Sequence, residues 1–341
     1  MLRLVVLALL QAAAPSPPPA ASPSVLFQDQ TPLVLRITTD LKALLRDRGD
    51  ERKEHDGRLR YTTPNGDTGS VSVKLRTRGI FRLKKCAFPP LRLDFPKGKV
   101  KGTPFAGQDK LKLVTHCDPW RSPYEQNLLE EYSLYGVFNA LTDQSFRARL
   151  AHVTYVDSAR NDSLVRYAFL IESDAELARR LAVTLIEANN VHDLRIADDV
   201  MNLVAMFEYL IGNTDWSVWL RHNIAIAQRP DGDLIAMPYD FDFAGVINAP
   251  YASPAPALNI KSVRDRVYRG FCQPESLVTA TLARFRAAKD SMYAVVRAVP
   301  DLEPREKKEM LDYFDQFYRI ADDPRAVRRE FMQGCRPRPP E

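Results

Sequence analysis

Four oxygen-bearing side chains within residues 207–245 of this 341-residue chain are the leading candidates for chemistry: Asp215, Asn223, Asp240 and Asp242. Carboxylate and amide oxygens are the ligands that Mg²⁺ and Mn²⁺ prefer in proteins. Phosphoryl transfer from ATP needs such a metal site, together with a carboxylate that orients or deprotonates the attacking hydroxyl. The pattern therefore predicts a site in which Asp215 is the base and Asn223, Asp240 and Asp242 are metal ligands.

Apolar elements on either side of these residues are expected to position them. Residues 199–211 carry apolar side chains at helical spacing, which predicts a helix that ends at Gly212. Residues 223–227 and 234–237 are short apolar runs separated by a turn sequence, which predicts a hairpin. The second strand of this hairpin leads directly into Asp240 and Asp242, so these carboxylates are expected to face the Asp215 loop.

The same residues also allow structural interpretations. Asp240 and Asp242 could be turn residues, Asp215 could be a loop cap, and a lone His222 beside a strand is more often structural than a general base. A cluster that holds only a structural cation such as Ca²⁺ would make the chain a non-catalytic binding module. A carboxylate-based hydrolase, with Asp215 and Asp240 as an acid/base pair, is a third hypothesis.

The order of these motifs resembles a known family. Asn213-Thr214-Asp215 follows the expected helix, Asn223 comes next, and the second strand leads into Pro238-Tyr239-Asp240-Phe241-Asp242. This order resembles CotH-type spore-coat kinases and, more distantly, HipA-type kinases. The resemblance implies an α+β, atypical protein-kinase-like fold with a strand-rich N-lobe and a helical C-lobe. It also implies transfer of the ATP γ-phosphate, with Mg²⁺ or Mn²⁺, to a Ser, a Thr or another hydroxyl of a protein or small molecule.

Residues expected to bind the nucleotide lie in the first half of the chain, where the resemblance is weaker. They are Arg78, Lys85, Lys112, Glu131 and Glu172, with Lys74 as another choice for the phosphate-binding lysine. Glu131 is expected to steady that lysine from a helix, and a surface position is expected for Glu130. The chain departs from the family in having Pro89-Pro90 where a lysine pair is usual, and it has no glycine-rich loop. These departures keep a non-catalytic, pseudokinase-like module as the alternative.

Local patterns predict strands in the first half of the chain and mainly helices in the second, with a boundary near Glu172. Strands are expected at residues 33–37, 58–62, 71–77, 91–95, 111–115, 151–156 and 165–171, and Asn65-Gly66 predicts a hairpin. Helices are expected at residues 40–48, 123–141 (with Ser122 as N-cap), 175–181, 199–211, 275–297, 303–319 and 323–333. The expected lobes are residues 24–172 and 173–341.

The ends, the cysteines and the charge predict an exported chain. Arg3, an apolar run and small residues resemble a signal peptide, and residues 1–23 are assigned to it and a proline-rich spacer. A secreted or periplasmic location is expected, with no membrane span in the mature chain. In an oxidising compartment, Cys86–Cys117 and Cys272–Cys335 are the favoured disulfides, because each pair stays within one half. The mixed charge, +5 overall, predicts no nucleic-acid partner.

Overall fold

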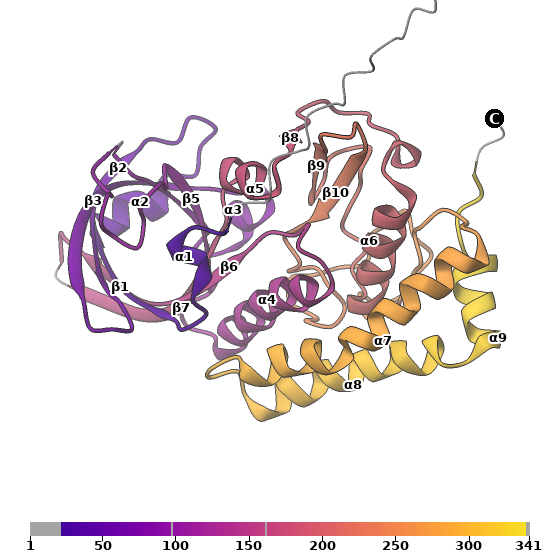
Figure 1. The fold of residues 1–341 in the computed structure, drawn as a ribbon. Helices are drawn as coiled ribbons and strands as arrows, with labels where there is room; N and C mark the ends of the chain where they lie inside the picture. Colours follow the sequence, from indigo (N-terminus) through magenta and orange to yellow (C-terminus); the bar gives the residue numbers. More distant parts are fainter. Residues whose placement is uncertain (1–21, 97, 161, 339–341) are drawn as a thin grey trace, which may run out of the picture.

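The computed structural model describes residues 22–96, 98–160 and 162–338 (Figure 1). The predicted signal peptide and most of the spacer lie outside the described residues. The chain forms a mixed α+β structure, with strands in the first half and mainly helices in the second, and two hydrophobic clusters. The α+β class is therefore confirmed. Across the described residues, no helix combines the length and the apolar character needed to cross a membrane.

Seven strands of the first half close into a barrel, in the order β1-β2-β3-β4-β5-β7-β6. The barrel closes where β1 runs parallel to β6, and all its other neighbours are antiparallel. The bounds are β1 Leu33–Thr39, β2 His55–Thr62, β3 Thr68–Thr77, β4 Leu91–Asp94, β5 Lys110–Thr115, β6 Ala148–Asp157 and β7 Asp162–Ile171. The sequence predicted each strand but not the closure.

Alternation of buried and exposed side chains explains why these segments form a barrel. Along β1, residues Leu33, Leu35 and Ile37 are buried while the side chains between them face outward. The expected hairpin at Asn65-Gly66 joins β2 to β3. Strand β2 begins at His55, three residues before the predicted start at residue 58, and its charged residues lie on the outer side of the barrel.

A long helix, α4 (Ser122–Leu141), lies between the barrel and the helical half (Figure 1). It is buried on most of its surface, since β7 packs on one side and α7 (Glu275–Ala298) on the other. Ser122 lies inside the helix, and Arg121 takes the N-cap position without a capping side-chain bond, so the predicted cap was wrong. Short helices α1 (Val25–Gln28), α2 (Leu41–Arg46) and α3 (Phe81–Lys85) accompany the barrel.

The second half packs helices around a small three-stranded sheet, β10-β9-β8. The bounds are α5 Asp174–Leu181, β8 Thr184–Leu185, a 3₁₀ turn Asp193–Arg195, α6 Asp198–Ile211, β9 Ile224–Gln228, β10 Leu234–Pro238, α8 Pro304–Ala321, α9 Pro324–Val327 and a π-helical turn Arg328–Gln333. Helix α6 is buried along almost its whole length, as its apolar pattern predicted. It ends at Gly212, whose φ of +69° suits a glycine C-cap.

Two disulfides tie segments within each half of the chain. Cys86 is bonded to Cys117 next to the barrel, and Cys272 is bonded to Cys335 near the C-terminus. Both predicted pairings are confirmed. The first disulfide begins at Cys86, the residue directly after α3.

Candidate functional site

The hairpin of β9 and β10 brings Asn223 and Asp240 to the same end of the small sheet. Ile224 and Pro238 are paired in the register, and the Tyr239 amide donates to the Asn223 carbonyl over 3.0 Å. Asn223 and Asp240 both have positive φ, 54° and 63°, a conformation that Asn and Asp adopt more readily than other non-glycine residues. The hairpin predicted from the sequence therefore holds these two residues at the same end of the small sheet.

Asp215 is fixed by hydrogen bonds to the residues around it. The Asn213 Oδ1 accepts from the Asp215 amide over 2.9 Å. The Asn223 Nδ2 donates to the Asp215 carbonyl over 2.7 Å and to its Oδ2 over 3.1 Å. His222 Nε2 lies 2.9 Å from Asp215 Oδ1, and this hydrogen bond raises the pKa of His222. The Asp215 side chain is 37% exposed, so it is oriented by its neighbours yet open to solvent.

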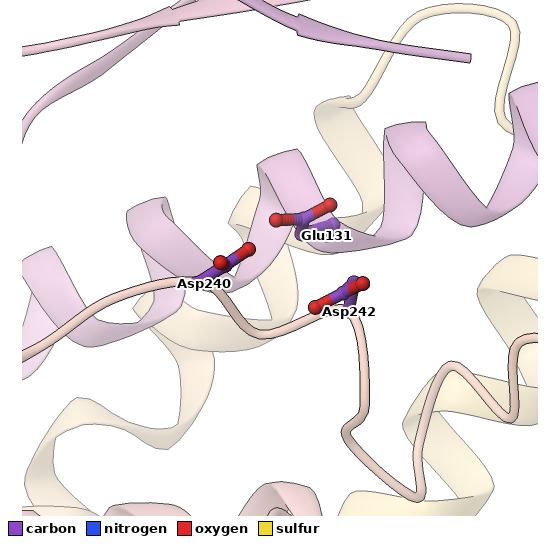
Figure 2. Close-up of side chains that lie close together, drawn as sticks. All are labelled: Glu131, Asp240 and Asp242. Atoms are coloured by element: carbon purple, nitrogen blue, oxygen red, sulfur yellow. The ribbon is translucent and has the colours of Figure 1, made fainter. Parts of the chain in front are cut away.

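Three carboxylates from two distant segments form a compact cluster (Figure 2). Glu131 lies on α4, and Asp240 and Asp242 lie on the segment after β10. One oxygen of each carboxylate lies within 4.8 Å of the others, which is a spacing compatible with a shared metal ion. We refer to Glu131, Asp240 and Asp242 as the carboxylate cluster. It contains two of the predicted metal ligands and the helix glutamate that was expected to steady a basic residue.

Arg82 of α3 lies within the carboxylate cluster and bonds to every member. Its Nη2 is 2.9 Å from both Glu131 oxygens and 2.7 Å from Asp240 Oδ1, and its Nε is 2.9 Å from Asp242 Oδ2. The guanidinium is therefore the counter-ion of the cluster. Sequence analysis missed Arg82; the available signal was a charged residue between Phe81 and Leu83, since a charge in an apolar run is often buried and paired.

Burial and neighbouring charges shift the pKa values of the three carboxyl groups in different directions. Burial raises the pKa of Glu131 to about 7, although Arg82 opposes the shift. Burial also raises the pKa of Asp242 well above its usual value. Burial acts in the same direction on Asp240, but Arg82, Arg78 and Lys112 outweigh it and lower the pKa of Asp240. Asp240 is thus the cluster member that stays ionised over the widest pH range.

Two of the predicted basic residues lie near Asp240. Arg78 is half-buried, and the loss of solvent around its guanidinium and the nearby Arg82 lower its pKa, while Asp240 favours its charge. Lys112 lies 5.1 Å from the Tyr239 ring centroid and 3.3 Å from Asp174 Oδ1, and its charge contributes to the low pKa of Asp240. Arg78 and Lys112 are therefore the basic residues that can face an anion bound at Asp240.

The other predicted basic residues lie elsewhere on the barrel. Lys85 is exposed at the C-terminal end of α3. Lys74 projects from β3 and pairs with Asp56 over 2.7 Å. Arg82, rather than either lysine, is the basic partner of Glu131.

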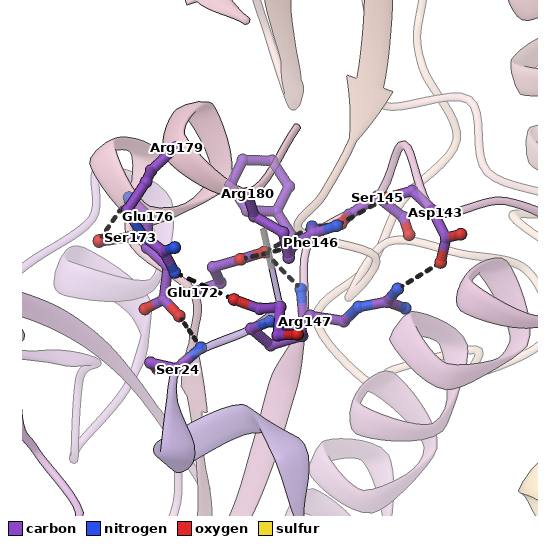
Figure 3. A network of polar contacts seen from close by, with 12 residues as sticks. Ser24, Asp143, Ser145, Phe146, Arg147, Glu172, Ser173, Glu176, Arg179 and Arg180 are labelled. Carbon is purple, nitrogen blue, oxygen red and sulfur yellow. Dashed lines mark hydrogen bonds and ion pairs between the residues drawn. The ribbon is translucent and has the colours of Figure 1, made fainter. Parts of the chain in front are cut away.

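Glu172 forms a closed ion pair at the end of β7 (Figure 3). Arg180 donates from Nε to Oε1 over 2.8 Å and from Nη2 to Oε2 over 2.9 Å, and the Arg147 amide donates to Oε2 over 3.1 Å. Arg180 also donates to the carbonyls of Asp143 and Ser145, which joins α5 to the turn before β6. Glu172 is fully buried, and the structure thus gives it a role in joining these segments.

Glu130 is buried, so the expected surface position was wrong. The side chain is 4% exposed and accepts from Asn127 Nδ2 over 3.0 Å. Burial raises its pKa to about 8. Glu130 is buried because α4 is covered by β7 on one side and α7 on the other.

No protein-family model matches this sequence, and no curated protein matches it significantly. The resemblance to CotH-type kinases therefore depends on the motifs quoted above.

Proposed function

We propose that this chain is an exported, kinase-like phosphotransferase that moves the ATP γ-phosphate to a hydroxyl of a protein or small molecule. The observation that carries the proposal is the contact among α3, α4 and the segment after β10. There, the Arg82–Glu131 ion pair meets Asp240. A kinase needs a basic residue paired with a helix glutamate, and both must lie next to the metal-binding aspartate.

The two lobes of the proposed kinase correspond to the two halves of the chain. The barrel with α3 and α4 would be the N-lobe, and the small sheet with α6 to α9 would be the C-lobe. The expected boundary near Glu172 follows β7, the last strand of the barrel. A seven-stranded closed barrel with no glycine-rich loop would make this an unusual member of that fold.

In the proposed reaction, Asp215 orients the acceptor hydroxyl and takes its proton. Asn223 holds the Asp215 side chain, and His222 bonds to the other carboxylate oxygen. Because the hydrogen bond to Asp215 raises the pKa of His222, the protonated imidazole is stabilised beside the carboxylate. The acceptor must approach from the side on which Asp215 is open to solvent.

The donor set of the cluster fits a hard divalent cation in part. Asp240 and Asn223 offer oxygens at the same end of the hairpin, and Asp240 is 40% exposed. Asp242 is buried and paired with Arg82, so it would have to give up that contact in order to hold the ion. A bound Mg²⁺ or Mn²⁺ would neutralise the nucleotide phosphates, and Arg78 and Lys112 would share that role. Metal affinity should rise with pH, since Glu131 and Asp242 must lose protons.

Calorimetric titration of ATP with MnCl₂ tests the proposal. We expect binding to wild type and at least a tenfold loss of affinity in Asp240→Ala. Asp233→Ala is the matched control, because Asp233 lies in the turn at the other end of the same hairpin. Unchanged nucleotide affinity in Asp240→Ala would contradict the assignment. Incubation with labelled ATP then tests catalysis, which Asp215→Ala should abolish.

A second candidate function is a non-catalytic, pseudokinase-like binding module. The observation that favours it is that the Arg82 guanidinium pairs with all three carboxylates of the cluster and so already supplies a positive charge among them. In such a module the cluster would join the two halves or hold a structural cation, and Asp215 would have no proton to accept. This alternative would be supported if ATP did not change the free energy of unfolding and if no phosphate were transferred in the presence of ATP and Mn²⁺.

A further inference from the structure

A hollow of about 310 Å³ lies beside the Asp215 loop. Its wall includes Trp216, Trp219, Tyr268 and two arginines, Arg269 and Arg336. Trp216 directly follows Asp215, and Trp219 lies on the short loop that returns to His222, where Ser217 and His222 form a β-bridge. The hollow thus adjoins the residue proposed to receive the acceptor hydroxyl.

Arg269 is anchored to the loop on both sides of Asp215. Its Nη1 donates to the Thr214 carbonyl over 2.7 Å and to the Trp216 carbonyl over 2.6 Å, and the guanidinium lies 4.8 Å from the Trp216 ring centroid. Within the part of the chain that the structure describes, Nη1 is the only guanidinium nitrogen of Arg269 with a hydrogen-bond partner. The remaining N–H groups can therefore donate to a ligand.

Arg269 forms no ion pair with the described residues. Glu208, Asp193 and Asp215 lie near enough to favour its charge, but Asp193 pairs with Arg336 and Asp215 with His222. Among the described residues that line the hollow, the only carboxylate is that of Asp193, which accepts from Arg336 Nη1 over 2.8 Å. Arg336 also stacks 4.2 Å from the Phe271 ring centroid, which fixes its direction. Two guanidinium groups and one carboxylate leave a net positive wall. A guanidinium with free donors favours a carboxylate, which accepts parallel hydrogen bonds.

We propose that this hollow binds an acidic side chain that flanks the acceptor hydroxyl in a peptide. Arg269 donates to its carboxylate, and Trp219, which is 46% exposed, provides the apolar wall against which the peptide packs. This inference depends on the proposed function for the identity of the acceptor. It adds a substrate class, namely peptides with Glu or Asp next to Ser or Thr.

Fluorescence anisotropy with labelled peptides tests the proposal in the absence of nucleotide and metal. Three probes are used: a Ser flanked on both sides by Glu, and its counterparts with Gln or Lys. A charge-assisted hydrogen bond contributes about 1.5–3 kcal/mol, so wild type should bind the Glu peptide at least about tenfold more tightly than the Gln peptide. Equal affinity for these two peptides would overturn the proposal.

Variants of the residues that line the hollow test whether the preference for the Glu peptide arises there. Arg269→Gln should remove the preference for Glu, whereas Trp219→Ala should weaken the Glu and Gln peptides to a similar extent. Arg266→Gln is the matched control, because Arg266 also donates to backbone carbonyls but does not line the hollow. A Glu preference retained in Arg269→Gln would refute the assignment. Failure of the proposed function would appear in the ATP and Mn²⁺ titrations, which do not depend on this hollow, so the two outcomes can be told apart.

Discussion

Replacing Arg82 with Met is expected to leave three carboxylates within 4.8 Å of one another without their counter-ion. Met is similar in length, so the substitution removes charge and hydrogen bonds with little loss of volume. Removing one partner of a buried ion pair costs about 3–5 kcal/mol, because the remaining charge is buried without compensation. We therefore expect the free energy of unfolding to fall by about 4 kcal/mol at pH 8.

The loss should be smaller at low pH. Glu131, with a pKa of about 7 in the wild type, and Asp242 become protonated as the pH falls, and a neutral carboxyl needs no counter-ion. In Arg82→Met the folded state retains these protons to a higher pH than the unfolded state does. Its stability therefore decreases as the pH rises, and the deficit relative to wild type should be about 2 kcal/mol larger at pH 8 than at pH 5.5.

Urea unfolding at both pH values, with and without MnCl₂, measures these effects. Mn²⁺ should restore part of the stability of Arg82→Met, because the cation can take the place of the guanidinium. Arg305→Met is the control: Arg305 forms an exposed pair with Glu309, so its loss should destabilise the fold far less than the loss of Arg82. A deficit in Arg82→Met that equals the control, or that does not change with pH, would refute Arg82 as counter-ion.

Three further predictions concern buried or constrained positions. Burial raises the pKa of Glu208 to about 8, so the folded wild type keeps a proton that the unfolded chain releases above about pH 4.5. The free energy of unfolding of the wild type therefore falls as the pH rises between these two values. In Glu208→Gln, the difference in the free energy of unfolding between pH 5.5 and pH 8, measured by urea unfolding, should be smaller by about 3 kcal/mol. Gly212→Ala should lower the melting temperature more than Gly66→Ala: both glycines have positive φ, but a Cβ at Gly212 would lie 2.0 Å from a tyrosine oxygen while at Gly66 nothing lies within 4 Å. Replacing Cys272 and Cys335 with Ser should cost about 2–5 kcal/mol in urea unfolding.

Local sequence patterns were sufficient to predict most elements and part of the candidate site. The hairpin that places Asn223 beside Asp240 follows from two short apolar runs and a turn, and the register confirms it. The disulfides followed from keeping each pair within one half of the chain. In these cases the interacting residues lie close in sequence, or only a few pairings were possible.

Long-range contacts explain what the sequence did not predict. Barrel closure requires β1 to pair with residues 151–157, and no local pattern records that partner. Arg82 was missed for the same reason, because its partners come from α4 and from the segment after β10. Glu172 was placed near the expected boundary, but its bond to Arg180 depends on the packing of α5 against the turn before β6.

Because the first disulfide lies at the end of α3, the position of Arg82 in the carboxylate cluster depends on whether the compartment is oxidising or reducing. Cys86 is the residue after α3, and its bond to Cys117 fastens the end of the helix that carries Arg82. In a reducing compartment, only non-covalent contacts would hold this end of the helix, such as the hydrogen bond from Arg48 Nη1 to the Cys86 carbonyl. Formation of this disulfide in an oxidising compartment would therefore fix the end of α3, and with it the position of Arg82 relative to the three carboxylates.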